Sequence, residues 1–253
     1  MLRERATEPE YFDSPARQPD EIIASYRELA RVNWLCRFAD PYTRIMSRWL
    51  GAANCRQLSI LDLGAGDGSL GREMEKFAQR QGWDWRVTNF DLNPVPLQLA
   101  PATHNVAGSV LALPFVENSF DVVIASQMTH HLADGDEVIQ HLREAWRVAR
   151  RGVFITDMTR GPFFYAAVWV MVHALRLSPA MRADGLLSVK RSWTCAELAG
   201  IAARSGLPGL SVRSYFGTRL IVSALKTPAS AAASGTSAAC RAADESCFAP
   251  HGK

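Results

Sequence analysis

Four glycines and two carboxylates occur together between residues 58 and 71. The segment reads Leu-Ser-Ile-Leu-Asp-Leu-Gly-Ala-Gly-Asp-Gly-Ser-Leu-Gly, so Asp62 stands two residues before Gly64, and Asp67 lies within the glycine-rich stretch. Glycines have no side chain to block a ligand, so a bound molecule can lie against bare backbone. The two carboxylates repel a pyrophosphate and attract positive charge. These residue types indicate a site for a cationic cofactor.

The residues on either side predict that this segment joins a strand to a helix. Residues 58–63 form a short apolar run, which is typical of a strand buried on both faces of a parallel sheet. From Leu70 onward, apolar residues recur at helical spacing. Gly66, Gly68 and Gly71 also match the dinucleotide pattern G-x-G-x-x-G. The two acids disfavour the nicotinamide oxidoreductase that this pattern would indicate.

Three further motifs follow in order along the chain. Residues 86–91 read Arg-Val-Thr-Asn-Phe-Asp, residues 107–115 read Ala-Gly-Ser-Val-Leu-Ala-Leu-Pro-Phe, and residues 119–126 read Ser-Phe-Asp-Val-Val-Ile-Ala-Ser. With the glycine segment, these motifs resemble the class I S-adenosylmethionine-dependent methyltransferases of the small-molecule, UbiE-like type. The resemblance covers residues 58–157.

The resemblance implies a fold, a cofactor and a set of contacts. The fold is α/β and Rossmann-like: a seven-stranded, mostly parallel sheet with an antiparallel C-terminal hairpin and helices on both faces. The cofactor is S-adenosyl-L-methionine. Asp91 would accept hydrogen bonds from the ribose hydroxyls, Leu92 would pack on the adenine, and Ser109 replaces the family's acid at the adenine amino group. The implied cofactor-binding residues are Asp62, Gly64, Ala65, Gly66, Gly68, Asp91, Leu92, Ser109, Val110, Ser126 and Gln127.

Two adjacent histidines follow the fourth expected strand, at the edge that the methyl group would face. Methylation of a hydroxyl requires the acceptor to be aligned and its proton removed, and histidine titrates near neutral pH. His130 and His131 are therefore the candidate catalytic residues, and the alternative is a hydrogen-bonded histidine that only shapes the pocket. Asp157, after the fifth expected strand, is expected to stand alone. No metal site is expected, because no acid follows the fourth strand and the five cysteines form no C-x-x-C pair.

The chain is expected to form one methyltransferase domain with additions at its ends. Capping pairs predict helices that begin after Asp134 and Thr194, and Gly217-Thr218 predicts a two-residue hairpin turn. The expected segments are a loosely ordered lead-in (1–19), the domain (20–226) with N-terminal cap helices (20–50) and a substrate-cap insertion (158–193), and a disordered tail rich in Ala and Ser (227–253).

The insertion contains an unusual segment, residues 163–177, that is apolar almost all round. Such a helix is buried, lies on a membrane or meets a partner, and this one is too short to span a bilayer. We expect a buried cap that is lined for an apolar or aromatic substrate. A homodimer face and a peripheral membrane contact are the alternatives. The candidate pocket residues are Tyr26, Asn33 and Tyr42, and the candidate anion-binding residues are Arg160, Arg182, Lys190 and Arg191.

Composition narrows the choice of partner and compartment. The net charge of +3 is spread without basic blocks and gives no case for a nucleic-acid partner. An odd number of scattered cysteines and no apolar leader fit a cytoplasmic protein. We expect a methyltransferase of secondary metabolism that O-methylates a hydrophobic, phenolic or polyketide-like small molecule. C-methylation in quinone or secondary-metabolite biosynthesis and a catalytically inactive, methyltransferase-like binding protein are the alternatives.

Overall fold

The computed structural model describes residues 2–13, 17–51, 55–100 and 104–226. In these residues a seven-stranded sheet forms the centre of the molecule, with the strand order β3-β2-β1-β4-β5-β7-β6. The strands are β1 (Gln57–Leu63), β2 (Asp84–Asp91), β3 (Asn105–Ala107), β4 (Phe120–Ser126), β5 (Ala149–Met158), β6 (Ser211–Tyr215) and β7 (Arg219–Leu225). The tail that we expected over residues 227–253 lies outside the described residues.

Neighbouring strands run parallel except at one edge of the sheet. β1 pairs in parallel with both β2 and β4, β3 pairs in parallel with β2, and β5 pairs in parallel with β4. β7 is antiparallel to both β5 and β6. The predicted fold class, a mostly parallel Rossmann-like sheet with an antiparallel C-terminal hairpin, is confirmed.

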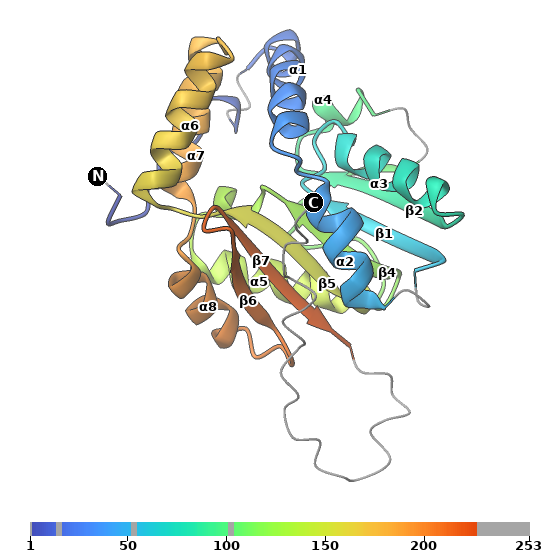
Figure 1. Cartoon of the computed structure of the whole chain (residues 1–253). Helices are drawn as coiled ribbons and strands as arrows, with labels where there is room; N and C mark the ends of the chain where they lie inside the picture. The colour runs from blue at the N-terminus through green and yellow to red at the C-terminus, as the bar shows by residue number, and fades with distance from the viewer. Residues whose placement is uncertain (1, 14–16, 52–54, 101–103, 227–253) are drawn as a thin grey trace, which may run out of the picture.

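Helices cover both faces of this sheet (Figure 1). The α-helices are α1 (Pro19–Leu35), α2 (Met46–Leu50), α3 (Ser69–Arg80), α4 (Pro94–Leu97), α5 (Gly135–Val148), α6 (Pro162–Ala174), α7 (Pro179–Arg191) and α8 (Cys195–Arg204). In β4, Val123 packs on the side of α5 and α8, whereas Val122 packs on the side of α2 and α3. Because both faces are buried, the central strands read as apolar runs in the sequence.

The two helix caps that the sequence predicts are present, whereas the predicted hairpin turn differs. The Asp134 side chain caps α5 by accepting hydrogen bonds from its first-turn amides, and Thr194 forms a complete capping box with Glu197 at the start of α8. The β6–β7 turn differs from the prediction, because residues 216–218 separate the two strands instead of two residues. Phe216 joins Gly217 in the left-handed region there, with φ values of 51° and 65°.

Residues 2–13, which we call the N-terminal strap, are held against the rest of the chain and are not the loosely ordered lead-in that we expected. The amide of Ala6 donates to the carbonyl of Lys190 (3.0 Å), and the amide of Tyr11 donates to the carboxylate of Asp184 (2.7 Å). The Arg5 guanidinium donates to the carbonyls of His130, Leu132, Ala133 and Arg191. Hydrogen bonds to distant residues fix the strap, so its own sequence carries no periodic signal.

The apolar insertion forms a pair of helices with one open face. α6 packs on α7 through the buried residues Val168 and Val172, and the pair stands beside α1 at one end of the sheet (Figure 1). On the opposite side of α6, Phe163 is 91% exposed and Val170 is 58% exposed. Among the described residues only one face of this helix finds a partner, and the expected role of the insertion as a substrate cap stays a prediction. None of the described helices is long and apolar enough to cross a membrane.

Candidate functional site

The glycine segment forms the turn between β1 and α3. The amides of Gly64 and Ala65 both donate to the carbonyl of Phe90 near the end of β2 (2.8 and 3.1 Å). Gly66 has a φ of 55°, and a Cβ atom added to it would lie 2.5 Å from Cε1 of Tyr26 on α1. The turn therefore requires glycine, and a side chain from α1 lies directly against it.

Asp91 ends β2 beside this turn. One of its carboxylate oxygens accepts a hydrogen bond from the amide of Gly66 (2.8 Å), and the other accepts one from the amide of Asn93 (2.9 Å). Burial raises the pKa of this carboxyl group, although the backbone hydrogen bonds oppose the shift. A carboxylate oxygen can accept more than one hydrogen bond. The neighbouring Leu92 is 73% exposed, so an acceptor group and an apolar surface lie side by side.

Asp62 is buried at the end of β1, where it is 1% exposed. Neither of its carboxyl oxygens has a hydrogen-bond partner among the described residues. Burial, with the negative charges of Asp91 and Asp67, raises the pKa of Asp62 to about 8. A buried acid without a partner is costly. A cationic ligand would supply the missing partner.

The other predicted cofactor residues after β1 and β3 lie at the same edge or close to it. Gly68, with a φ of 67°, is the N-terminal cap of α3. The Ser109 hydroxyl accepts a hydrogen bond from the amide of Leu111 (3.2 Å) and so stabilises a local turn. The amide of Gly108 donates to the carbonyl of Asp91 (2.9 Å), which ties this turn to the end of β2. Val110, in contrast, packs partly into the core.

The end of β4 presents polar groups without partners. Ser126 is the last residue of the strand, and Gln127 follows with a φ of 56°. In the described part of the chain, the buried side-chain amide of Gln127 and the buried hydroxyl of Thr129 have no hydrogen-bond partner. Positive φ is uncommon for a residue other than glycine. The strained position and the two unpaired groups indicate a place where a ligand binds.

His130 is buried under this edge and is anchored by Asp157. Nδ1 of His130 lies 2.7 Å from a carboxylate oxygen of Asp157, and the His130 amide donates to the other oxygen (2.8 Å). The expectation that Asp157 stands alone is therefore wrong. β4 and β5 are neighbours in the sheet, so the residues that follow them meet at its carboxyl edge. The predicted order of strands could therefore have indicated that His130 and Asp157 lie close together.

His131 is held by the strap. Nδ1 of His131 lies 3.1 Å from a carboxylate oxygen of Asp13, and its ring centroid lies 4.3 Å from that of His130. Burial lowers the pKa of His131, but the hydrogen bond to Asp13 and the charges of Glu10 and Asp13 outweigh burial and raise it to about 9. Glu10 and Asp13 were missed by sequence reasoning, since no local pattern connects the strap with the histidines.

Several other candidate pocket residues have structural roles. Tyr42 is fully buried, and its hydroxyl hydrogen-bonds the carbonyl of Ala125 and the Thr156 hydroxyl. Arg160, expected to receive an anionic substrate group, is buried and pairs with Glu197 (2.5 Å). These side chains hold the core and the strap, so they are not free to bind a substrate.

Comparison with protein families gives a match over the part of the chain that carries these motifs. Residues 61–156 match the family model described as a methyltransferase domain. This range begins in β1 and ends in β5, so it contains the glycine turn, Asp91 and both histidines. No curated protein matches the sequence of the chain.

Solved structures with the same fold are also methyltransferases. A SAM-dependent methyltransferase from Aquifex aeolicus is 17% identical, with a TM-score of 0.53, and the match covers 83% of this chain and 98% of that one. The plantazolicin methyltransferase BpumL, solved with a desmethylPZN analog and SAH, is 14% identical (TM-score 0.61; 85% and 92% covered). Human N-acetylserotonin methyltransferase, solved with SAM, is 14% identical (TM-score 0.56; 85% and 61% covered). At these identities the likeness shows the fold.

Replacing Asp62 by Asn should flatten the pH dependence of stability. The Asp62 carboxyl has a pKa of about 8 in the folded protein and 3.8 as its ordinary value. Between these values only the folded state holds the proton, so the wild-type protein loses stability as the pH rises from about 4 to about 8. The contribution of this group is at most about 1.4 kcal/mol per pH unit. Urea unfolding across this range measures it.

The matched control is Asp84→Asn, which removes an exposed acid at the start of β2. It should leave the wild-type pH dependence unchanged, whereas Asp62→Asn should reduce the slope. Parallel curves for all three proteins would contradict the assignment of an unpartnered, protonated Asp62.

Proposed function

Because this chain is a class I S-adenosylmethionine-dependent methyltransferase, whose residues 61–156 match the methyltransferase family model, we propose that it O-methylates a hydrophobic small molecule of phenolic or polyketide-like type. The observation that carries this proposal is the burial of the reactive edge. His130 is 2% exposed, and Glu10 of the strap beside it is 8% exposed. A protein or RNA chain would reach His130 only if the strap moved away, whereas a small molecule needs a smaller opening.

The residues at the carboxyl edge fit S-adenosylmethionine, which supplies a methyl group already activated on a sulfonium centre. Asp91 is proposed to accept hydrogen bonds from the ribose hydroxyls, and Leu92 is proposed to contact the adenine. The cationic end of the donor would favour ionisation of the buried Asp62 carboxyl, which lacks any other partner in the described part of the chain. The proposed donor site is completed by Gly64, Ala65, Gly66, Gly68, Ser109, Val110, Ser126 and Gln127.

The two histidines are the proposed catalytic residues. A phenol or hydroxyl attacks the methyl group well only as it loses its proton. Asp157 engages Nδ1 of His130, which leaves Nε2 as the nitrogen that can act on an acceptor. The ring of His131 lies tilted against that of His130, with centroids 4.3 Å apart, and its Nδ1 contacts Asp13 of the strap. The pair is therefore proposed to activate the acceptor hydroxyl.

An apolar wall beside the histidines supports the hydrophobic acceptor. Met158 follows Asp157 and packs, with Tyr165 and Phe164 of α6, against the cluster formed by α1, α6 and α7. The body of the acceptor is proposed to lie along this wall.

C-methylation of an activated ring uses the same donor site and stays the alternative. The cytoplasmic location also stays a proposal, supported by the free thiols of the three described cysteines.

Transfer of radiolabelled methyl from S-adenosylmethionine into host lysate tests the class of acceptor. The organic extract should gain label with the wild-type enzyme and with the surface control Asp84→Ala, because the acceptor is a hydrophobic small molecule. Asp91→Ala should abolish transfer, because it removes the proposed ribose acceptor. Label concentrated in the acid precipitate would contradict the proposal and indicate a macromolecular acceptor. Label in neither fraction would favour the inactive, binding-protein alternative.

His130→Gln tests the catalytic proposal once the labelled acceptor is isolated. We expect kcat to fall by about 100- to 10,000-fold, which is the usual contribution of acid–base assistance, while the KM for the methyl donor is unchanged. His104→Gln, at an exposed histidine after α4, should leave both values at the wild-type level. A wild-type kcat in His130→Gln would sink the catalytic role and leave His130 as a structural residue.

A further inference from the structure

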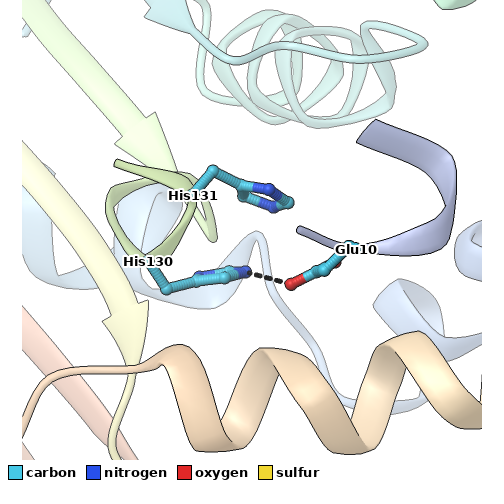
Figure 2. Close-up of side chains that lie close together, drawn as sticks. All are labelled: Glu10, His130 and His131. Carbon is cyan, nitrogen blue, oxygen red and sulfur yellow. Dashed lines mark ion pairs between the residues drawn. The ribbon is translucent and has the colours of Figure 1, made fainter. Parts of the chain in front are cut away.

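The strap carries a carboxylate into the histidine pair. Figure 2 shows Glu10 facing His130, with His131 next to both. One carboxylate oxygen of Glu10 and one ring nitrogen of each histidine lie within 4.8 Å of one another. We propose that Glu10, His130 and His131 form a binding site for one divalent transition-metal ion, represented by Zn²⁺.

The first argument is that Glu10 and His130 lack a cation between them. Asp157 accepts hydrogen bonds from Nδ1 of His130 (2.7 Å) and from the amides of His130 and Met158 (2.8 and 2.7 Å). Such a carboxylate is an acceptor only, so Nδ1 carries the proton and Nε2 presents its lone pair. That lone pair faces Oε1 of Glu10 at 3.7 Å. A positive charge between these two atoms, from a proton on Nε2 or from a metal ion, would make the contact attractive.

Protons could supply that charge, but the second histidine favours a metal ion. If each ring carried an extra proton, two positively charged imidazolium rings would repel each other with their centroids only 4.3 Å apart. One divalent ion provides the same charge from a single point that all three donors can reach.

The second argument is the set of groups behind the donors. Nδ1 of His130 is engaged by Asp157, and Nδ1 of His131 is engaged by Asp13. Metal-binding histidines commonly donate the proton of their other ring nitrogen to a carboxylate, which fixes the tautomer and makes the ligand more basic. The Ser188 hydroxyl likewise donates to Oε1 of Glu10 (2.7 Å) and orients it. Each proposed ligand is therefore already positioned by a partner.

The third argument is the local charge. Three carboxylates and two guanidinium groups lie around the pair, on the strap, β5 and α7, which leaves one negative charge before any histidine is counted. These groups are Glu10, Asp13 and Asp157, with Arg5 and Arg191. Arg5 and Arg191 direct much of their hydrogen bonding to backbone carbonyls of residues 130–132, so the carboxylates keep most of their charge.

The donor atoms indicate the class of ion. Two imidazole nitrogens and one carboxylate oxygen suit Zn²⁺ and related transition metals, whereas Mg²⁺ and Ca²⁺ prefer oxygen ligands. In a tetrahedral zinc site the ligand atoms lie about 3.3 Å apart, so the three donor atoms would draw together on binding. Such a site keeps an open position. In the proposed function, on which only this purpose of the metal depends, Nε2 of His130 would bind the ion instead of taking the proton itself, and the ion at its open position would make the acceptor hydroxyl more acidic.

Calorimetric titration of the full chain with ZnCl₂, after removal of metals with EDTA, tests the proposal without acceptor or methyl donor. The wild-type protein should bind one equivalent, and MgCl₂ should give no binding. Glu10→Gln should weaken Zn²⁺ binding by more than about 100-fold, because the loss of an outer partner alone costs about 10- to 100-fold. Glu8→Gln, at an exposed acid of the same strap, should bind like the wild type.

Two results would overturn the proposal: no Zn²⁺ binding by the wild-type protein, or equal affinity in Glu10→Gln, which would assign binding to the cysteines. Circular dichroism checks that Glu10→Gln is folded. If it is not, the absorption spectrum of the wild-type protein with Co²⁺ decides, because strong thiolate charge-transfer bands would contradict a site made of imidazole and carboxylate. Methyl transfer in the absence of Zn²⁺ binding would support the proposed function and reject only the metal site.

Discussion

Three carboxyl groups that repel one another define the carboxyl edge of this sheet. Asp62 is enclosed at its centre without a hydrogen-bond partner among the described residues, and the charges of Asp67 and Asp91 add to the cost of ionising it. An anionic pyrophosphate would meet this repulsion, whereas a cationic ligand relieves it. The turn itself is tightly packed and requires glycine, because an added Cβ atom would lie 2.5 Å from Tyr26 at Gly66 and 2.5 Å from Met128 at Gly64. The choice of cofactor therefore follows from electrostatics at one edge.

The reactive half of the site depends on a different set of contacts. The Arg191 guanidinium donates to the carbonyls of Glu8, His130 and His131. One buried cation thus joins the strap, the turn after β4 and α7. Asp157 fixes the ring of His130 from the end of β5. Because these segments share partners, the strap and the histidines form one unit, and a change in one should be felt by the others.

Sequence reasoning succeeds here where the signal is local. The strand before the glycine turn, the cap at Thr194 and the order of the motifs are each encoded within a few residues, and they led to the correct sheet. The contacts that link distant segments carry no such signal. Asp157 and His130 are 27 residues apart, and only the pairing of β4 with β5 brings them together. Glu10 lies in a segment without periodicity, so its place beside the histidines could not be predicted.

The apolar insertion also shows what a sequence pattern does not predict. An all-round apolar segment predicts burial, but it does not say how many faces find a partner. α6 buries the side that meets α7 and leaves Phe163 exposed. Packing against a particular neighbour is a property of the whole fold, and the amino-acid pattern of one helix does not contain it.

Calorimetric titration of the purified chain with S-adenosylmethionine and, separately, with NAD tests the central claim most directly. The account predicts that S-adenosylmethionine binds with one equivalent per chain and that NAD gives no binding heat, because the acids of the glycine turn select the cationic ligand. Binding of NAD without binding of S-adenosylmethionine would contradict the account, since the turn would then accept a pyrophosphate beside Asp62 and Asp67.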